Sequence, residues 1–282
     1  MSEKIKVKKE GFLLDYLVQE LKGWSRNKLK KRLQTGSITV NDESTTQHNF
    51  PLKAEDLIVV GAEKGRGPGA RLELLYSDKD IIAINKPAGL LSVATNSEKD
   101  KHALAILRKQ LSKPQKPVKL WPVHRLDRDT SGVLLFATSR EVREKISASW
   151  DKAEKTYLAI VEGCPKNKQG TIDQPLRMEP NIYQAIVGEH REAKKAVTHY
   201  ELKESSRKRS LLEVKLETGR QHQIRAHMLW LGHSIVGDKR YGSSGPRMGL
   251  HAFKLKIIHP KTGEKIVFET EAPVGFMKLI YP

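Results

Sequence analysis

The feature that most constrains the fold of this chain is a glycine-rich break about a quarter of the way along it. Residues 61–70, GAEKGRGPGA, contain four glycines and one proline in ten positions. The segment has no apolar periodicity, which is typical of a linker between folded units. We therefore expect a small first domain over residues 1–62, a linker over 63–71 and a larger second domain over 72–282.

The first domain has the pattern of two helices and a short hairpin. Apolar residues recur at helical spacing over residues 13–21. A second helix is expected after Ser25, a favourable N-cap, and is expected to end at Gly36. Residues 37–40 alternate as a strand, and the apolar run 57–60 predicts the strand that returns beside it. The two helices are expected to pack on this hairpin.

The second domain has short, often β-branched apolar segments separated by turns and helical patterns. Helical spacing appears over residues 102–111 and 141–152. The expected strands cover residues 81–84, 133–136, 157–161, 211–216 and 254–258. This arrangement predicts an α+β fold, in which a mainly antiparallel mixed sheet is covered by helices and preceded by the small helix-hairpin domain.

The net charge points to a polyanionic partner. The chain has 51 Lys and Arg against 33 Asp and Glu, a formal net charge of +18. Neutralising phosphates releases counterions and favours binding to nucleic acid; an anionic membrane and a simple solubility effect are the alternatives. No apolar run approaches the roughly 18 residues of a membrane-spanning helix, and no secretory signal follows the N-terminus. The single cysteine, Cys164, excludes an internal disulfide and cysteine-based metal sites, so a cytoplasmic protein is expected.

The positive charge of the first domain is concentrated on its second predicted helix. No acidic residue lies between Glu20 and Asp42. A solvated helix face normally mixes charges, so a surface that follows phosphates is favoured over a merely soluble helix. The segment SRNKLKKRLQTGSITVND resembles the alpha-L RNA-binding domain, first known from a ribosomal protein, over residues 10–62. The predicted RNA-binding residues of this helix are Arg26, Lys28, Lys30, Lys31 and Arg32.

Two polar clusters of the second domain could hold reactive groups. Residues 121–132, WPVHRLDRDTSG, form a polar loop that leads into an apolar strand, and such a strand fixes what the loop presents. The plainer alternative is a turn in which Asp127 pairs with Arg125 or Arg128. The loop does not fit a protein kinase, whose Asp directly follows the Arg.

The other cluster is TGRQHQIRAHM, residues 218–228. Its two histidines are five residues apart and no zinc-protease Glu is present, so metal binding is disfavoured. Arg220 and Arg225 suit RNA or an acidic partner better. Tyr157 in the segment KTYLA reads by itself as a core residue with a bonded hydroxyl, and residues 85–90, NKPAGL, predict a tight turn.

Taken together and in this order, these segments carry a family resemblance. NKPAGLLSV, HRLDRDTSGVLLFA, KTYLA and GRQHQIRAHM, followed by GHSIVGDKRYG, closely resemble the RluA-type RNA pseudouridine synthases over residues 72–282. The resemblance implies isomerisation of uridine without a cofactor. The sequence is consistent with this, since it has no nucleotide-binding glycine motif, metal cluster or redox pair.

The resemblance also assigns roles to individual residues. Asp127 is the carboxylate beside the ribose, acting as a nucleophile or assisting elimination, and Arg225 is its cationic partner. Tyr157 lies against the uracil, where a stacking role and a general-base role remain open. Arg125 enters the RNA helix as the uridine leaves the stack.

The resemblance also indicates the substrate. It favours large-subunit ribosomal RNA, with transfer RNA as the alternative; no membrane is involved, and a monomer is expected. The rival hypothesis is a catalytically silent RNA-binding or ribosome-assembly protein. A DNA-binding protein ranks lowest, because the sequence has no helix-turn-helix or zinc pattern.

Overall fold

The chain forms two compact units, Met1–Ala70 and Arg71–Pro282. The structure is a computed structural model that describes residues 3–34, 36–41, 43–45, 47–61 and 71–281. Apart from Arg71, the linker predicted over residues 63–71 lies outside these described residues. Within the described ranges, no helix is long and apolar enough to cross a lipid bilayer.

The first unit contains the two helices and the antiparallel strand pair expected from its sequence. Leu29 and Leu33 of the second helix are fully buried, and the Ser25 hydroxyl accepts a hydrogen bond from the Lys28 N–H at 3.2 Å, as an N-cap does. The sheet has the order β1–β6–β3–β4. The predicted pair is β6 and β3, and the outer strands β1 and β4 were not predicted from the sequence. The elements are β1 (Glu3–Lys6), β2 (Gly11–Phe12), α1 (Leu13–Glu20), α2 (Arg26–Gln34), β3 (Ile38–Val40), β4 (Glu43–Ser44), β5 (Pro51–Leu52) and β6 (Leu57–Val60).

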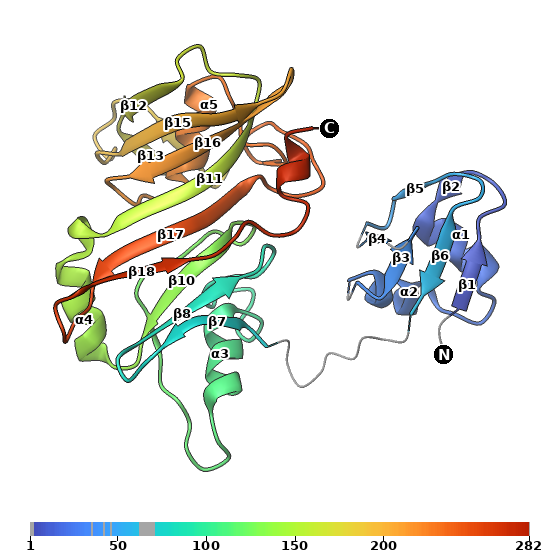
Figure 1. Cartoon of the computed structure of the whole chain (residues 1–282), viewed down its shortest axis with the longest axis horizontal. Coiled ribbons are helices and arrows are strands. Elements are labelled where there is room, and N and C mark those ends of the chain that lie inside the picture. Colours follow the sequence, from blue (N-terminus) through green and yellow to red (C-terminus); the bar gives the residue numbers. More distant parts are fainter. Residues whose placement is uncertain (1–2, 35, 42, 46, 62–70, 282) are drawn as a thin grey trace. The chain divides into compact units, whose positions relative to one another are not determined.

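The second unit is built on a ten-stranded sheet (Figure 1). Its main path runs β12–β15–β16–β11–β17–β10–β8–β7, with β18 beside β17 and β9 beside β10. All pairings are antiparallel except that of β10 with β17, which confirms the predicted mainly antiparallel mixed sheet. The strands are β7 (Glu73–Ser77), β8 (Ile81–Lys86), β9 (Trp121–Pro122), β10 (Ser131–Ala137), β11 (Glu154–Glu162), β12 (Gln169–Asp173), β15 (Val197–Ser205), β16 (Arg209–Leu216), β17 (Leu250–Ile258) and β18 (Lys265–Glu269).

Helices cover both faces of this sheet, while a separate hairpin lies beside α5. Leu107 of α3 packs with Ile84, whereas Ile146 of α4 packs with Ala83, so successive residues of β8 enter different cores. Strands buried on both faces need continuous apolar runs, which is the pattern seen in the sequence. The helix predicted over 141–152 is split into α4 and η1. The remaining elements are α3 (Ala103–Leu111), α4 (Arg140–Ala148), η1 (Trp150–Lys152), β13 (Leu176–Glu179), β14 (Gln184–Val187), α5 (Gln223–Trp230) and η2 (Met277–Leu279).

A glycine allows β10 to begin directly beside β17. Gly132 has φ +116°, and a Cβ atom added there would lie 2.2 Å from the Ala252 carbonyl oxygen. Only glycine fits such a close approach of two backbones. The loop that precedes Gly132 is therefore delivered to the middle of the sheet, between strands that are far apart in the sequence.

Candidate active site

The loop that carries Asp127 is held on both sides by the last residue of β8 and the segment that follows it. The Ser92 hydroxyl accepts from the Leu126 N–H at 3.0 Å and donates to the Leu126 carbonyl at 2.7 Å. On the other side, the Lys86 ammonium donates to the Arg128 carbonyl at 3.1 Å. Asp127 thus lies between two residues whose backbones are fixed, which restricts where its carboxylate can point.

Lys86 is a fully buried ammonium group whose three N–H donors each have an acceptor. Besides Arg128, it donates to the carbonyls of Pro87 at 3.0 Å and Leu90 at 2.7 Å. Burial lowers the pKa of Lys86 to about 8, and the nearby charges of Asp129 and Asp127 oppose this shift. The segment predicted only as a tight turn therefore also ties its own backbone to the Asp127 loop.

Arg225, on α5, joins two carboxylates that come from different loops. Its Nη1 lies 2.9 Å from Asp127 Oδ2, while Nε and Nη2 lie 2.6 and 2.9 Å from the two oxygens of Asp238. The side chain of Asp238 is 2% exposed and that of Asp127 is 23% exposed. The two-point contact with Asp238 fixes the guanidinium plane, so the third nitrogen, Nη1, is aimed at Asp127.

Arg225 stays positively charged in these surroundings. Burial alone would lower the pKa of Arg225, but the hydrogen bonds and charges of Asp238 and Asp127 outweigh burial and raise the pKa above its ordinary value. A permanent cation therefore lies 2.9 Å from the Asp127 carboxylate, the group that would act as nucleophile or base.

His222 also faces Asp127, and sequence reasoning gave it no role. It has φ +57° at the start of α5, and its Nε2 lies 3.7 Å from Asp127 Oδ2. The Tyr241 hydroxyl accepts from the Ala185 N–H at 2.7 Å and lies 3.0 Å from His222 Nδ1. In the tautomer that satisfies this chain, the Tyr241 O–H donates to Nδ1 and the Nε2–H faces Asp127.

The charge state of His222 follows from its surroundings. Burial lowers the pKa of His222, and the positive charges of Arg225 and Arg240 add to the effect, although Asp127 opposes it. The imidazole is therefore neutral around pH 7 and adds no second full charge beside Asp127.

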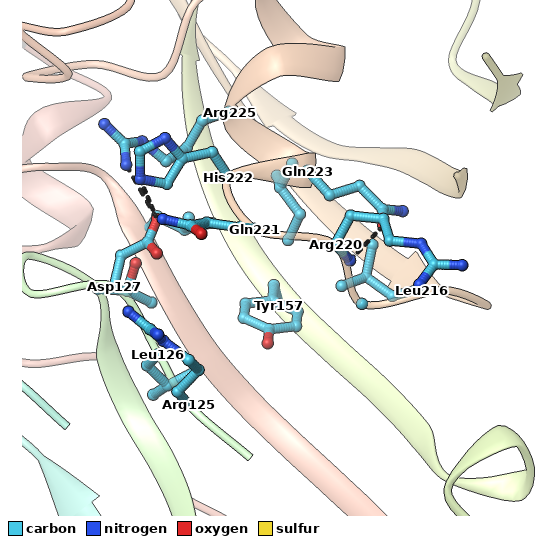
Figure 2. A pocket seen from close by; sticks show the side chains of 14 residues that line it. Arg125, Leu126, Asp127, Tyr157, Leu216, Arg220, Gln221, His222, Gln223 and Arg225 are labelled. Atoms are coloured by element: carbon cyan, nitrogen blue, oxygen red, sulfur yellow. Dashed lines mark hydrogen bonds and ion pairs between the residues drawn. The ribbon is translucent and has the colours of Figure 1, made fainter. Parts of the chain in front are cut away.

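Tyr157 stands across a cavity of about 140 Å³ from Asp127 (Figure 2). It comes from β11 at a register shift opposite β17, between Thr156 and Leu158, and such bulges re-aim side chains next to active sites. Burial and the charge of Asp127 raise the pKa of Tyr157, so its hydroxyl keeps its proton around pH 7. This favours stacking over a role as a ready-made phenolate base.

The structure brings together the catalytic residues predicted from the resemblance and places Arg125 beside them. Asp127, Tyr157 and Arg225 line one pocket, and exposed Arg125 belongs to the same lining. The alternative in which Asp127 pairs with Arg125 or Arg128 is wrong, because Arg128 instead binds Asp129 at 3.1 Å and Asp127 binds Arg225.

The basic helix of the first unit uses part of its charge internally. Arg26 pairs with Asp15 at 2.8 Å, and Arg32 donates to the Gly61 carbonyl. The Lys28 ammonium lies 3.9 Å from the centre of the Trp24 ring, but Lys28 stays exposed. Fewer of the predicted cations are therefore open to a ligand than the sequence suggested. The side chain of Lys31 lies outside the described residues.

Sequence reasoning did not identify the residues that hold the predicted catalytic residues in place. Asp238 and Tyr241 both lie in the segment GHSIVGDKRYG, and Ser92 and Lys86 lie in or beside NKPAGLLSV. The sequence did contain a signal for Asp238, since this residue is the single acid of a segment otherwise rich in basic and small residues. Its partner, however, was not deducible without the tertiary structure.

Comparison with known proteins defines the class to which this fold and site belong. A family model described as RNA pseudouridylate synthase matches residues 80–230. The solved structure of human RNA pseudouridylate synthase domain containing 4 superposes with a TM-score of 0.60 and 25% identity, over 73% of this chain and 90% of that one. The chain belongs to the RNA pseudouridine synthases, enzymes that isomerise uridine in RNA, and within them to the RluA type, which confirms the resemblance.

The curated relatives differ in their RNA substrates. The ribosomal large subunit pseudouridine synthase D of Vibrio cholerae is 32% identical, over 99% of this chain and 93% of its own length. The tRNA pseudouridine synthase C of Vibrio vulnificus is 36% identical, over 74% of this chain and 94% of its own length. An uncharacterised RNA pseudouridine synthase of Synechocystis is 34% identical, over 96% of this chain and 88% of its own length.

Proposed function

We propose that this chain converts specific uridines of large-subunit ribosomal RNA to pseudouridine, with Asp127 as the reactive carboxylate. The observation that carries the catalytic assignment is the contact of Asp127 with Arg225 at 2.9 Å beside Tyr157 in one pocket. Ribosomal RNA is favoured because the large-subunit relative matches 99% of this chain, whereas the transfer RNA relative matches 74%.

The reaction needs few groups, and this pocket supplies them. The bond from uracil N1 to ribose C1′ breaks, the base turns, and C5 bonds to C1′; C5 then loses a proton and N1 gains one, so the product is an isomer. Asp127 either attacks C1′ and is displaced when C5 bonds there, or removes a proton from C2′ and returns it when C5 bonds to C1′. Arg225 donates to the Asp127 carboxylate, and its two-point contact with Asp238 keeps the guanidinium in place. The freed uracil packs on the ring of Tyr157 while it turns.

Arg125 is placed to contact the RNA around the target uridine and not the glycosidic bond that breaks. It is exposed, and it lines both the Asp127 pocket and the larger cavity beside it. A base that flips out leaves a gap in the stack, and a guanidinium plane can fill it while pairing with phosphate. We assign this role to Arg125. Every lining residue of the pocket belongs to the second unit.

We assign RNA binding in the first unit to the alpha-L type surface on α2, chiefly Lys28 and Lys30. Replacing both by alanine is expected to weaken RNA binding and to reduce the slope of log K against log salt by about 0.7 to 0.9 for each phosphate that is no longer neutralised. Dissociation constants measured at several salt concentrations give the slope. Lys9→Ala, an exposed lysine of the same unit outside α2, is the matched control. If the double variant had the same dissociation constant and the same salt dependence as Lys9→Ala, the assignment of RNA binding to α2 would be refuted.

The target RNA is tested by mapping pseudouridines in cells with and without the gene. We expect at least one site of large-subunit ribosomal RNA to lose its pseudouridine in the deletion strain and to regain it with the wild-type gene. Unchanged ribosomal RNA, with losses confined to transfer RNA, would contradict the proposed substrate and leave the catalytic assignment standing.

A further inference from the structure

The tip of the β13–β14 hairpin holds a tyrosine in an unfavourable backbone conformation beside the active site. Tyr183 has φ +51°, in the left-handed region that bulky side chains rarely adopt. It is 50% exposed and lines a cavity of about 740 Å³ to which Arg125, Asp127 and Arg225 also contribute. Strain of this kind persists only where the surroundings impose it, and it gathers at ligand sites.

The surroundings that impose this conformation are the loops of the active site. Gln221 Nε2 donates to the Tyr183 hydroxyl at 2.8 Å, and Arg240 Nη1 donates to the Ile182 carbonyl at 2.8 Å. Gln221 is next to His222 in the sequence, and Arg240 is two residues from Asp238. The loops that position Asp127 and Arg225 therefore also fasten the hairpin tip.

The ring of Tyr183 has neighbours suited to RNA. The Arg240 guanidinium carbon lies 5.2 Å from the ring centre, and the ring of His222 meets it at 86° with the centres 5.6 Å apart. Half of the residue nevertheless stays open to solvent. An open aromatic ring next to an arginine is the usual platform for an unpaired base and its phosphate.

We propose that Tyr183 and Arg240 bind the nucleotide adjacent to the target uridine. Its base stacks on the open part of the Tyr183 ring, and its phosphate contacts Arg240. The inference rests on the proposed function, in which the target uridine occupies the Asp127 pocket. Flipping that uridine unstacks its neighbour, and Tyr183 and Arg240 line the same larger cavity as Arg125, the residue assigned to flipping. The enzyme then favours uridines whose neighbour is also unpaired.

The test uses the full-length enzyme and total RNA labelled with [5-³H]uridine from a strain that lacks the gene. Release of tritium from C5 measures pseudouridine formation, and rates are compared over a range of RNA concentrations. We expect Tyr183→Ala to raise the apparent KM about 5- to 100-fold, the range for removing one base stack, with kcat changed by less than about twofold. Tyr183→Phe, which keeps the ring but lacks the hydroxyl, is expected to stay near wild type. Ile182→Ala, an equally exposed neighbour, is the matched control.

Two results would overturn the inference. A KM for Tyr183→Ala equal to that of Ile182→Ala would show that the ring binds nothing. A Tyr183→Phe variant as impaired as Tyr183→Ala would show that the residue serves only to anchor the hairpin through its hydroxyl. Failure of the proposed function would give a different result, namely normal tritium release by Asp127→Asn in the same assay.

Discussion

Asp127→Asn is expected to form no measurable pseudouridine, a loss of at least about 10⁴-fold in kcat, while still binding RNA. Asparagine has nearly the same shape and keeps one oxygen that can accept from Arg225 Nη1, now 2.9 Å from the carboxylate. It lacks the charge and the nucleophilic oxygen that the chemistry requires. Tritium release from labelled RNA measures the reaction, and a binding assay shows whether the substrate is still held.

The neighbouring acid provides the control for this prediction. Asp129 lies two residues away in the same loop, is half exposed and pairs with Arg128. Asp129→Asn should retain activity within about threefold, since exposed ion pairs contribute little. Normal turnover by Asp127→Asn would refute the mechanism, and equal losses in both variants would indicate damage to the loop instead of loss of the reactive group.

Arg225→Met is expected to lose about 10² to 10³ in kcat and about 3 to 5 kcal/mol in the free energy of unfolding. The change leaves Asp238 buried without a counter-charge and leaves Asp127 with no cation in hydrogen-bond contact. Thermal unfolding and tritium release measure the two effects. Because this variant can fail to fold, Arg225→Lys is measured beside it.

Arg225→Lys separates charge from geometry. Lysine keeps the positive charge, but it lacks the planar fork that binds Asp238 at two points while reaching Asp127. We expect stability to recover in part, with kcat still at least about tenfold below wild type. Asp238→Asn should likewise lower kcat more than it raises KM, because it weakens the two-point contact that aims Arg225 at Asp127. Full activity in both variants would remove the argument that Asp238 positions Arg225.

Local patterns in the sequence were sufficient to predict much of the fold. The short apolar runs 81–84 and 133–136 fall in β8 and β10, and α2 begins after Ser25 because the Ser25 hydroxyl caps the Lys28 N–H. The β15 strand and the split after α4 were not predicted. Hydrophobic spacing reports which residues are buried together within a segment, but it says little about where a helix breaks or a polar strand pairs.

The sequence by itself determined the family and predicted the two-part organisation and the reactive acid, since these depend on short motifs read along the chain. Only the tertiary structure decided what holds that acid in place. The order β11–β17–β10–β8 brings together strands that are far apart in the sequence, so Ser92 and Lys86 reach the backbone on either side of Asp127, and Arg225 meets both Asp127 and Asp238. The pairing of polar side chains depends on this sheet order, because a hydrogen bond requires two groups within about 3 Å, whatever their separation along the chain.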